Sequence, residues 1–235
     1  MALLLFDIDG TLLRPLGIGR RAFERALRRL HGSVPSERFG YDGLLDPQIA
    51  RQTLAQLGIP PERAAVESLL EVYIEELARE PAPPRREALC PGIPEVLQEA
   101  RQRGHHLGLL TGNVRAGAGI KIGLLGLLDF FRTAPEVPLL GAFGEDALER
   151  ASLVPVALAR CTAAFGSGFE PARTWIVGDS RRDVAAAKAA GIRCAAVATG
   201  FTSLGELRSL GPELALPDLS DPAPLLDGVE GRAAA

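Results

Sequence analysis

Polar side chains suited to catalysis follow three short apolar stretches of the sequence. They are Asp7 with Asp9, Thr111 with Gly112 and Asn113, and Asp179 with Asp183. Carboxylates that share one crevice repel one another unless a cation lies between them. A hard divalent cation such as Mg²⁺ prefers carboxylate oxygens and often binds substrate phosphate oxygens as well. We therefore expect Asp7, Asp179 and Asp183 to form a magnesium site, since the sequence offers no cluster of His and Cys suited to zinc.

The spacing of Asp7 and Asp9 favours two different roles. On an extended chain both side chains would face the same side, and Gly10 would then allow a sharp turn. One carboxylate could attack an electrophile, and the other could act as general acid and then as general base. Thr111 adds a hydroxyl donor, and the amides after it open the following predicted helix, which suits an anion. These residues do not supply a fixed positive charge for a phosphoryl group.

The elements that must position these residues alternate between helix and strand. Each helical pattern is followed by an apolar strand pattern: 94–103 with 105–110, 152–166 with 172–179, and 181–190 with 192–198. This alternation predicts a parallel sheet with helices on both faces, so the fold class is α/β and doubly wound. Ligands of such sheets bind at the carboxyl ends of the strands, where the polar residues would meet.

Residues 15–88 have a different pattern, with three successive amphipathic helical segments and no convincing strand between them. We expect an all-helical insertion, followed by a stiff proline-rich hinge at 81–86. The predicted division is an α/β core at 1–14 and 89–228, a helical cap at 15–88, and a frayed tail at 229–235. Most of the five arginines of the first helical segment are expected to form a solvated basic face.

Composition excludes several classes of protein. The 26 basic residues are outnumbered by 29 acidic residues, so there is no broad basic field for nucleic acid. The first apolar run is too short for a signal peptide or a membrane span. Three widely separated cysteines predict reduced core thiols and a cytoplasmic protein: Cys90, Cys161 and Cys194. A monomer or a homodimer is expected.

Three motifs together resemble a known family. The sequences DIDGT at 7–11, TGN at 111–113 and GDSRRD at 178–183 resemble motifs I, II and IV of the haloacid dehalogenase superfamily, in the same order. The resemblance covers nearly the whole chain, since this superfamily inserts helical caps between motifs I and II. The phosphoglycolate phosphatase-like group is the most similar. The resemblance implies a Rossmann-like core and a Mg²⁺-dependent phosphatase.

By position, the resemblance also implies roles for single residues. Asp7 would attack phosphorus to form an aspartyl-phosphate, and Asp9 would protonate the leaving oxygen and later activate water. Mg²⁺ would be bound by the carboxylates of Asp7 and Asp179 and by the main-chain carbonyl of Asp9. Asp183 would orient these ligands or their waters. The implied phosphate-binding residues are Thr111, Gly112 and Asn113.

The chain departs from the family pattern at motif III, which usually has a lysine. The segment 144–160 has none, and we expect Arg150 to replace it, with Arg160 as the alternative. The guanidinium group binds phosphate and carboxylate through a broader, more rigid fork than an ammonium does. The two lysines of the chain, Lys121 and Lys188, are expected to be solvated or packing residues.

The predicted function is Mg²⁺-dependent hydrolysis of a small phosphorylated metabolite. A dehalogenase does not need Asp9 as acid and base, and a phosphonate hydrolase would need a cap lysine, which residues 15–88 lack. A phosphomutase or phosphotransferase on the same core stays open. So does a non-catalytic scaffold that binds a phosphorylated ligand. A receiver-like domain would not carry a helical insertion directly after its first acidic strand end.

Overall fold

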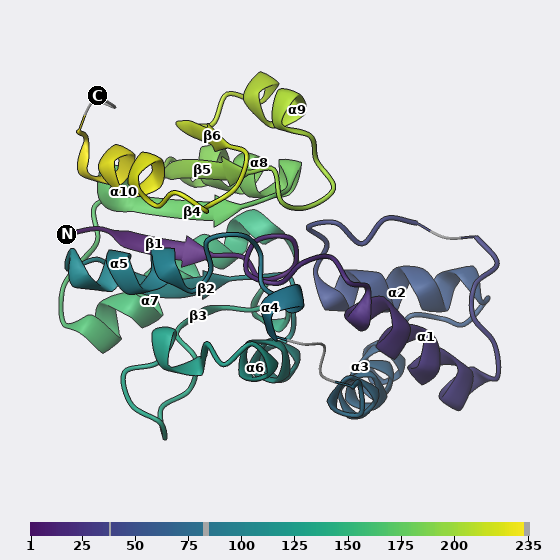
Figure 1. The fold of residues 1–235 in the computed structure, drawn as a ribbon. Coiled ribbons are helices and arrows are strands. Elements are labelled where there is room, and N and C mark those ends of the chain that lie inside the picture. Colours follow the sequence, from purple (N-terminus) through teal and green to yellow (C-terminus); the bar gives the residue numbers. More distant parts are fainter. Residues whose placement is uncertain (38, 82–84, 233–235) are drawn as a thin grey trace.

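A six-stranded parallel sheet forms the centre of the molecule (Figure 1). The computed structural model describes residues 1–37, 39–81 and 85–232. The strand order across the sheet is β3-β2-β1-β4-β5-β6. The strands are β1 (Leu3–Phe6), β2 (His106–Leu110), β3 (Gly141–Ala142), β4 (Thr174–Gly178), β5 (Arg193–Val197) and β6 (Leu214–Leu216). The predicted doubly wound α/β fold is confirmed.

Helices connect the strands and also make up the segment between β1 and β2. The helices are α1 (Ile18–His31), α2 (Asp46–Gln56), α3 (Arg63–Ala78), α4 (Arg85–Ala88), α5 (Glu95–Gln102), α6 (Arg115–Leu124), α7 (Leu153–Phe165), α8 (Arg181–Ala190), α9 (Leu204–Ser209) and α10 (Ala223–Glu230). Short 3-10 turns are η1 (Leu128–Phe130), η2 (Gly144–Asp146), η3 (Arg150–Ser152) and η4 (Pro171–Arg173). The helix and strand patterns predicted at 94–110, 152–179 and 181–198 are confirmed.

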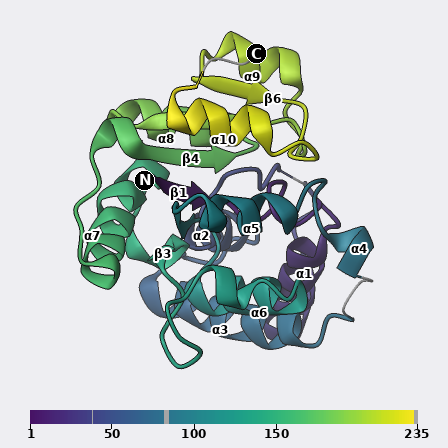
Figure 2. The ribbon, with the colours of Figure 1, turned by 60° about the vertical axis from the view of Figure 1, so that its left-hand side comes forward.

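Both faces of the sheet are covered, as the continuous apolar strands require. Successive side chains of a strand point to opposite faces. Leu4 and Phe6 accordingly pack in one core cluster with residues of α5 and α10, whereas Leu3 and Leu5 pack in a second cluster with residues of α7 and α8. Figure 2 shows these helices on the two sides of the sheet. Packing on both faces thereby fixes the positions of the strands and of their carboxyl ends.

Helices α1, α2 and α3 lie together beyond the carboxyl end of β1 (Figure 1). No strand occurs among the described residues of 15–81. Four of the five arginines of α1 form ion pairs with glutamates, and their side chains stay 37–54% exposed, so they lie on a solvated face as the sequence suggested, although acidic partners neutralise its basic charge. The pairs include Arg21 with Glu80, Arg25 with Glu76 and Glu80, Arg28 with Glu24, and Arg29 with Glu75 and Glu76.

The structure bears on two boundaries predicted from the sequence. The proline-rich hinge at 81–86 lies partly outside the described residues, because these omit 82–84; α4 begins at Arg85. The tail was expected to fray from residue 229, but α10 continues to Glu230 and Val229 is buried in the core. Frayed ends lack such apolar contacts, so the prediction is wrong for these two residues. Residues 233–235 lie outside the described part of the chain.

The three cysteines are buried and unpaired, as expected for core thiols. Burial raises the pKa of Cys90 and of Cys161 to about 12, and it raises the pKa of Cys194 as well. A thiol with so high a pKa holds its proton and is a poor nucleophile. Catalysis by cysteine is therefore not supported.

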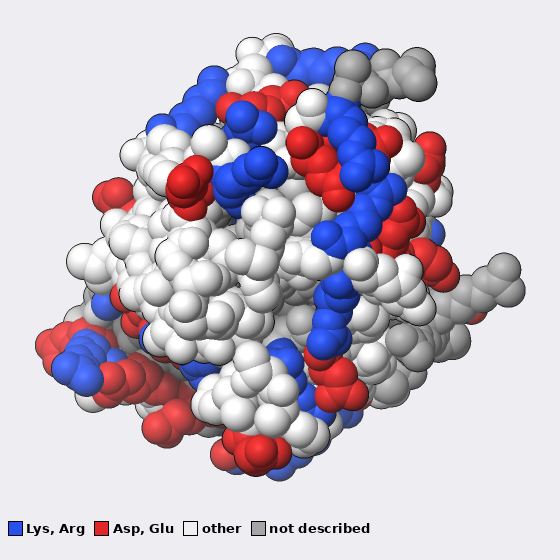
Figure 3. Space-filling view, turned by 90° about the vertical axis from the view of Figure 1, so that its left-hand side faces the viewer, with Lys and Arg blue, Asp and Glu red and all other residues white. Residues whose placement is uncertain are grey.

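The molecular surface opposite α1–α3 mixes both signs of charge. In Figure 3, basic side chains form a narrow column flanked by acidic side chains beside a broad uncharged area. This face thus presents no wide basic field of the kind that grips nucleic acid. Among the described helices, none combines the length and the apolar character needed to span a bilayer.

Candidate active site

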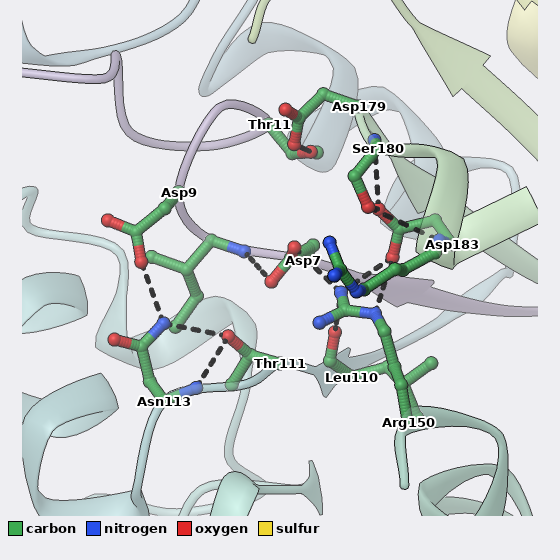
Figure 4. Close-up of polar contacts among 12 residues, drawn as sticks. Asp7, Asp9, Thr11, Leu110, Thr111, Asn113, Arg150, Asp179, Ser180 and Asp183 are labelled. Carbon is green, nitrogen blue, oxygen red and sulfur yellow. Dashed lines mark hydrogen bonds and ion pairs between the residues drawn. The ribbon is translucent and has the colours of Figure 1, made fainter. Parts of the chain in front are cut away.

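The strand order brings the predicted polar residues together. Strands β2, β1 and β4 are neighbours in the sheet, and Phe6 lies opposite both Leu109 of β2 and Val177 of β4. Asp7, Thr111 and Asp179 follow these strands, so they lie at adjacent carboxyl ends (Figure 4). Parallel sheets bind their ligands at this edge.

The chain turns immediately after Asp7, which separates Asp7 from Asp9. The carbonyl of Ile8 accepts hydrogen bonds from the amides of residues 11, 12 and 13, and Gly10 has a φ of 86°. The extended spacing considered from the sequence does not continue to Asp9. As a result, the Asp7 carboxylate points toward Arg150, and the Asp9 carboxylate points toward Asn113 (Figure 4).

Asp7 is buried and paired with Arg150. The Arg150 Nη2 atom lies 2.7 Å from Asp7 Oδ2, and the Ile8 amide donates to Asp7 Oδ1 over 2.7 Å. Burial raises the pKa of Asp7 to about 6, against the opposing effect of the Arg150 charge. The carboxylate is therefore held in one orientation in surroundings with little water, which suits a nucleophile.

Arg150, the residue predicted to replace the motif III lysine, lies beside Asp7. It lies in η3, directly before α7, and its buried guanidinium also contacts Asp183 Oδ1 at 2.6 Å. The alternative, Arg160, is bound instead to Asp146 and to the carbonyl of Gly141. The geometry thus places the charge of Arg150, and not that of Arg160, beside Asp7.

Three buried acids gather beside Arg150. Asp7, Asp179 and Asp183 each offer a carboxylate oxygen, and these oxygens lie within 4.8 Å of one another. Burial, and then the charges of Asp183 and Asp7, raise the pKa of Asp179 well above its usual range. A cation in this position would relieve that repulsion. The all-oxygen donor set fits Mg²⁺, in agreement with the residues predicted from the sequence.

Glycines leave room for the Asp179 carboxylate. A Cβ atom at Gly10 would lie 2.3 Å from Asp179 Oδ2, and one at Gly200 would lie 1.6 Å from the same atom. Either substitution would require the carboxylate to move. Thr11 also fixes this group, since its hydroxyl donates to Asp179 Oδ1 over 3.0 Å.

Both oxygens of Asp183 already have protein partners. Oδ1 accepts from Arg150 Nε and Nη2, and Oδ2 accepts from the amide and hydroxyl of Ser180. The Ser180 hydroxyl in turn caps the N-terminus of α8. These contacts suit the orienting role that the family resemblance implied for Asp183.

Asp9 forms a separate charge cluster with Lys121. The Lys121 Nζ atom lies 2.8 and 2.6 Å from the two Asp9 carboxylate oxygens. It lies 2.7 Å from Asn113 Oδ1, and Asn113 Nδ2 donates to Asp9 Oδ2 over 2.8 Å. Lys121 was expected to be solvated or merely packing, and this is wrong, because its side chain is buried and paired with Asp9. Lys188, by contrast, is exposed.

The loop after β2 contains side-chain hydrogen bonds that the sequence did not predict. Asn113 Nδ2 also donates to Thr111 Oγ1 over 2.8 Å, so the Asn113 side chain bridges Thr111 and Asp9. Helix α6 begins at Arg115, two residues later than the amides expected to open it. Gly112 packs against residue 44, and a Cβ there would lie 2.1 Å from the Leu44 carbonyl oxygen.

Asp46 is a buried acid of this region that the sequence did not reveal. Its amide donates to the Gly112 carbonyl over 2.7 Å, and its carboxylate accepts from the Val114 amide over 2.9 Å. The N-terminus of α2 is thereby joined to the loop after β2. Burial raises the pKa of Asp46 to about 7, against the opposing charge of Lys121.

One cavity of about 420 Å³ connects these groups. It is lined by Asp7, Asp9, Thr111, Asn113, Lys121, Arg150 and Asp179 from the sheet side, and by residues of α1, α2 and α3. Arg20 is the arginine of α1 that lines it. Its guanidinium lies 3.8 Å from the Tyr41 ring centroid and donates to the Phe39 carbonyl. Among the described residues, no carboxylate forms an ion pair with Arg20.

Sequence reasoning missed the roles of Lys121 and Asp46, and only Lys121 has a recognisable signal in the sequence. Lys121 shares the buried stripe of α6 with Ala118 and Ile122, and a lysine inside such a stripe indicates a buried partner. Asp46 lies in the first turn of α2, where an acid is ordinary. No local signal distinguishes it from a residue that simply favours the start of a helix.

Comparisons with known proteins agree with this geometry. Residues 1–191 match the family model of the haloacid dehalogenase-like hydrolases. A phosphoglycolate phosphatase of Pseudomonas putida is 27% identical, over 92% of this chain and 76% of the relative. Protein CbbY of Rhodobacter capsulatus is 26% identical, over 92% and 93% of the two chains.

Solved structures share the fold. CbbY of Rhodobacter sphaeroides, crystallised with xylulose-1,5-bisphosphate, superposes with a TM-score of 0.70 at 22% identity, over 94% of this chain and 96% of that one. A hydrolase of Pseudomonas syringae gives a TM-score of 0.68 at 18% identity, over 100% of both chains. These matches confirm the Rossmann-like fold class, and the family model confirms a hydrolase. With its sheet, its strand-end acids and 191 of its 235 residues matched by one family model, this chain belongs to the haloacid dehalogenase-like hydrolases.

Proposed function

We propose that this hydrolase is a Mg²⁺-dependent phosphatase that acts on a small phosphomonoester. The observation that carries the proposal is the presence of two carboxyl groups with different surroundings in one cavity. Asp7 is buried beside Arg150, and the Asp9 side chain is 44% exposed. Relatives named phosphoglycolate phosphatase support a phosphomonoester as substrate.

The acid cluster supplies the metal ligands in this proposal. The carboxylates of Asp7 and Asp179 and the main-chain carbonyl of Asp9 would hold Mg²⁺, while Asp183 keeps Arg150 in place. When bound, the cation neutralises negative charge on the phosphoryl oxygens and on the attacking carboxylate. Thr111, the amides of Gly112 and Asn113, and Arg150 would bind the phosphoryl oxygens.

The reaction has two steps. In the first, an Asp7 oxygen attacks phosphorus, the bond from phosphorus to the leaving oxygen breaks, and that oxygen takes the proton of the Asp9 carboxyl. In the second, Asp9 takes a proton from water while the water oxygen attacks phosphorus, and the bond to Asp7 breaks. Inorganic phosphate leaves, Asp7 is again a carboxylate, and Asp9 is again protonated.

Residues 15–88 would act as the cap that covers the cavity and selects the leaving group. The Asp46 contacts with the loop after β2 would hold α2 against the phosphate-binding residues. Arg20, the arginine of α1 that lines the cavity, would bind a negatively charged group of the substrate. A cytoplasmic location and a monomeric or homodimeric state remain predictions from the sequence.

The test is a phosphatase screen over small phosphate esters with and without Mg²⁺. The panel includes 2-phosphoglycolate, a sugar bisphosphate and neutral alkyl phosphates. We expect phosphate release that requires Mg²⁺ and is lost in Asp7→Asn. Transfer of the phosphoryl group to a second sugar hydroxyl, without free phosphate, would indicate a phosphomutase. Binding without any turnover would indicate a scaffold. Either result contradicts the proposal.

A further inference from the structure

Lys121 is one of only two lysines in the chain, and it is buried at the edge of the cavity. A buried ammonium group is costly unless charged or polar partners surround it. Its Nζ atom has such partners in the two Asp9 oxygens and in Asn113 Oδ1, all within 2.8 Å. The partners belong to the loops after β1 and β2, which carry the proposed chemistry. Lys121 therefore faces the reaction rather than the solvent.

The contacts restrict a side chain that would otherwise be free to rotate. The Asp9 side chain is 44% exposed, in contrast to that of Asp7, which is 7% exposed. Among the residues that the structure describes, Lys121 Nζ and Asn113 Nδ2 are the side-chain donors that bind its carboxylate. A general acid must lie within hydrogen-bond reach of the oxygen that it protonates. An unrestrained Asp9 would spend much of its time elsewhere.

A glycine of α1 leaves room for the Lys121 ammonium group. Gly19 of α1 has no side chain, and a Cβ at this position would lie 3.2 Å from Lys121 Nζ and 3.6 Å from the Tyr73 hydroxyl. Helix α1 can thus approach the ammonium closely without displacing it from Asp9.

We propose that Lys121 is a positioning residue that holds the Asp9 carboxyl toward the leaving oxygen of the substrate. The proposal rests on the proposed function, because it assigns Asp9 the role of general acid. Lys121 Nζ reaches both oxygens of Asp9. One oxygen can therefore carry the proton while the other still accepts a hydrogen bond from the ammonium.

The test compares two esters that differ in their need for a proton. An alkyl phosphate has a poor leaving group that requires protonation, whereas p-nitrophenyl phosphate releases a stable anion that does not. For both esters kcat/KM reports the steps up to departure of the alcohol. In Lys121→Met we expect kcat/KM to fall by roughly 10- to 100-fold for the alkyl ester and by less than about 3-fold for the aryl ester. Lys121→Gln, which can still donate one hydrogen bond, should give an intermediate loss.

Two further variants serve as controls. Lys188→Met removes the other lysine, which is exposed on α8 and donates to the Leu210 carbonyl, and it should leave both constants unchanged. In an Asp9→Asn background, Lys121→Met should add less than about 2-fold, because both changes remove the same function.

The outcomes separate the two proposals. If the wild-type protein hydrolyses no member of the phosphate-ester panel with Mg²⁺, the proposed function fails. If it hydrolyses both but Lys121→Met and Lys121→Gln lower the two constants equally, Lys121 has only a structural role and the inference is overturned. The inference is also overturned if kcat/KM stays unchanged for both esters in Lys121→Met and Lys121→Gln. It is likewise overturned if Lys121→Met lowers kcat/KM for the alkyl ester as much in the Asp9→Asn background as it does in the wild type.

Discussion

The two carboxyl groups of the DIDGT segment have opposite surroundings, although only one residue separates them. Asp7 lies in a buried cluster in which Arg150 contacts both Asp7 and Asp183. Asp9 lies at the cavity, in a cluster in which Lys121 and Asn113 contact its exposed carboxylate. The turn that begins at Ile8 sends the two side chains to these different partners.

The difference indicates how one loop can carry two chemical roles. A nucleophile benefits from a fixed orientation and from little competing water, which the buried Asp7 cluster provides. A group that passes a proton must reach both the leaving oxygen and water, and the exposed Asp9 can do so. Each cluster has its own cation, Arg150 or Lys121. Substitutions in one cluster should therefore affect activity separately from substitutions in the other.

The largest effect is expected when the buried cluster loses its cation. Arg150→Ala would leave Asp7 and Asp183 buried without their positive partner. We expect kcat to fall by about 10²- to 10³-fold, and the free energy of unfolding to fall by about 3–5 kcal/mol. Steady-state kinetics and urea unfolding would measure both changes.

Arg160→Ala is the matched control for that experiment. Arg160 is bound to Asp146 and is partly exposed, so its loss should change kcat by less than about 3-fold. A large loss in Arg160→Ala together with a small one in Arg150→Ala would transfer the motif III role to Arg160. In that case Arg150 would not be the functional cation of the Asp7 cluster, and the contrast with the Asp9–Lys121 cluster would no longer hold.

A smaller and more selective effect is expected at the exposed cluster. Asp9→Asn should lower kcat/KM by about 10²-fold for an alkyl phosphate and much less for p-nitrophenyl phosphate, because only the former needs a proton. The free energy of unfolding should fall by roughly 1–3 kcal/mol, because the buried Lys121 ammonium loses its carboxylate partner but keeps Asn113 Oδ1 and an amide oxygen as acceptors. An equal loss with both esters would show that Asp9 does not act as the acid.

The smallest effect concerns Asp46, the buried acid near Lys121. Burial raises its pKa from 3.8 to about 7, so the folded protein binds a proton that the unfolded chain releases between these pH values. Stability from this group is therefore lost as pH rises from about 4 to about 7. In Asp46→Asn, which still offers an oxygen to the Val114 amide, this loss should be absent.

Urea unfolding at a series of pH values checks that prediction. The stability of Asp46→Asn relative to the wild type should increase by roughly 1–3 kcal/mol between pH 4 and pH 8. A difference that stays constant, or that decreases with pH, would show that Asp46 is ionised in the folded protein throughout the range.

Much of the Asp7 cluster could be predicted from the sequence, because its residues follow strands. Asp7 and Asp179 directly follow β1 and β4, which are adjacent in the sheet, and apolar strands are recognisable in sequence. Asp183 lies in the first turn of the next helix, in a capping pattern with Ser180. Their convergence follows from parallel topology alone.

The Asp9 cluster could not be predicted in the same way, because it depends on tertiary packing. Lys121 comes eight residues after Asn113, and only the rotation of α6 against the sheet decides which of its side chains face Asp9. Asp46 meets Val114 through a hydrogen bond that spans 68 residues of sequence. The sequence predicted a solvated basic face for most of the α1 arginines, but it did not reveal their glutamate partners Glu76 and Glu80, which became evident only in the structure.

The central claim is that Asp7 forms a covalent bond to phosphorus. The most direct measurement is acid quenching of the enzyme during turnover of a phosphomonoester with Mg²⁺, followed by peptide mass spectrometry. We predict a phosphorylated peptide that contains Asp7, and its absence in Asp7→Asn. Steady turnover with no phosphorylated peptide in the quenched wild-type enzyme, or a phosphoryl group on a different residue, would contradict the account.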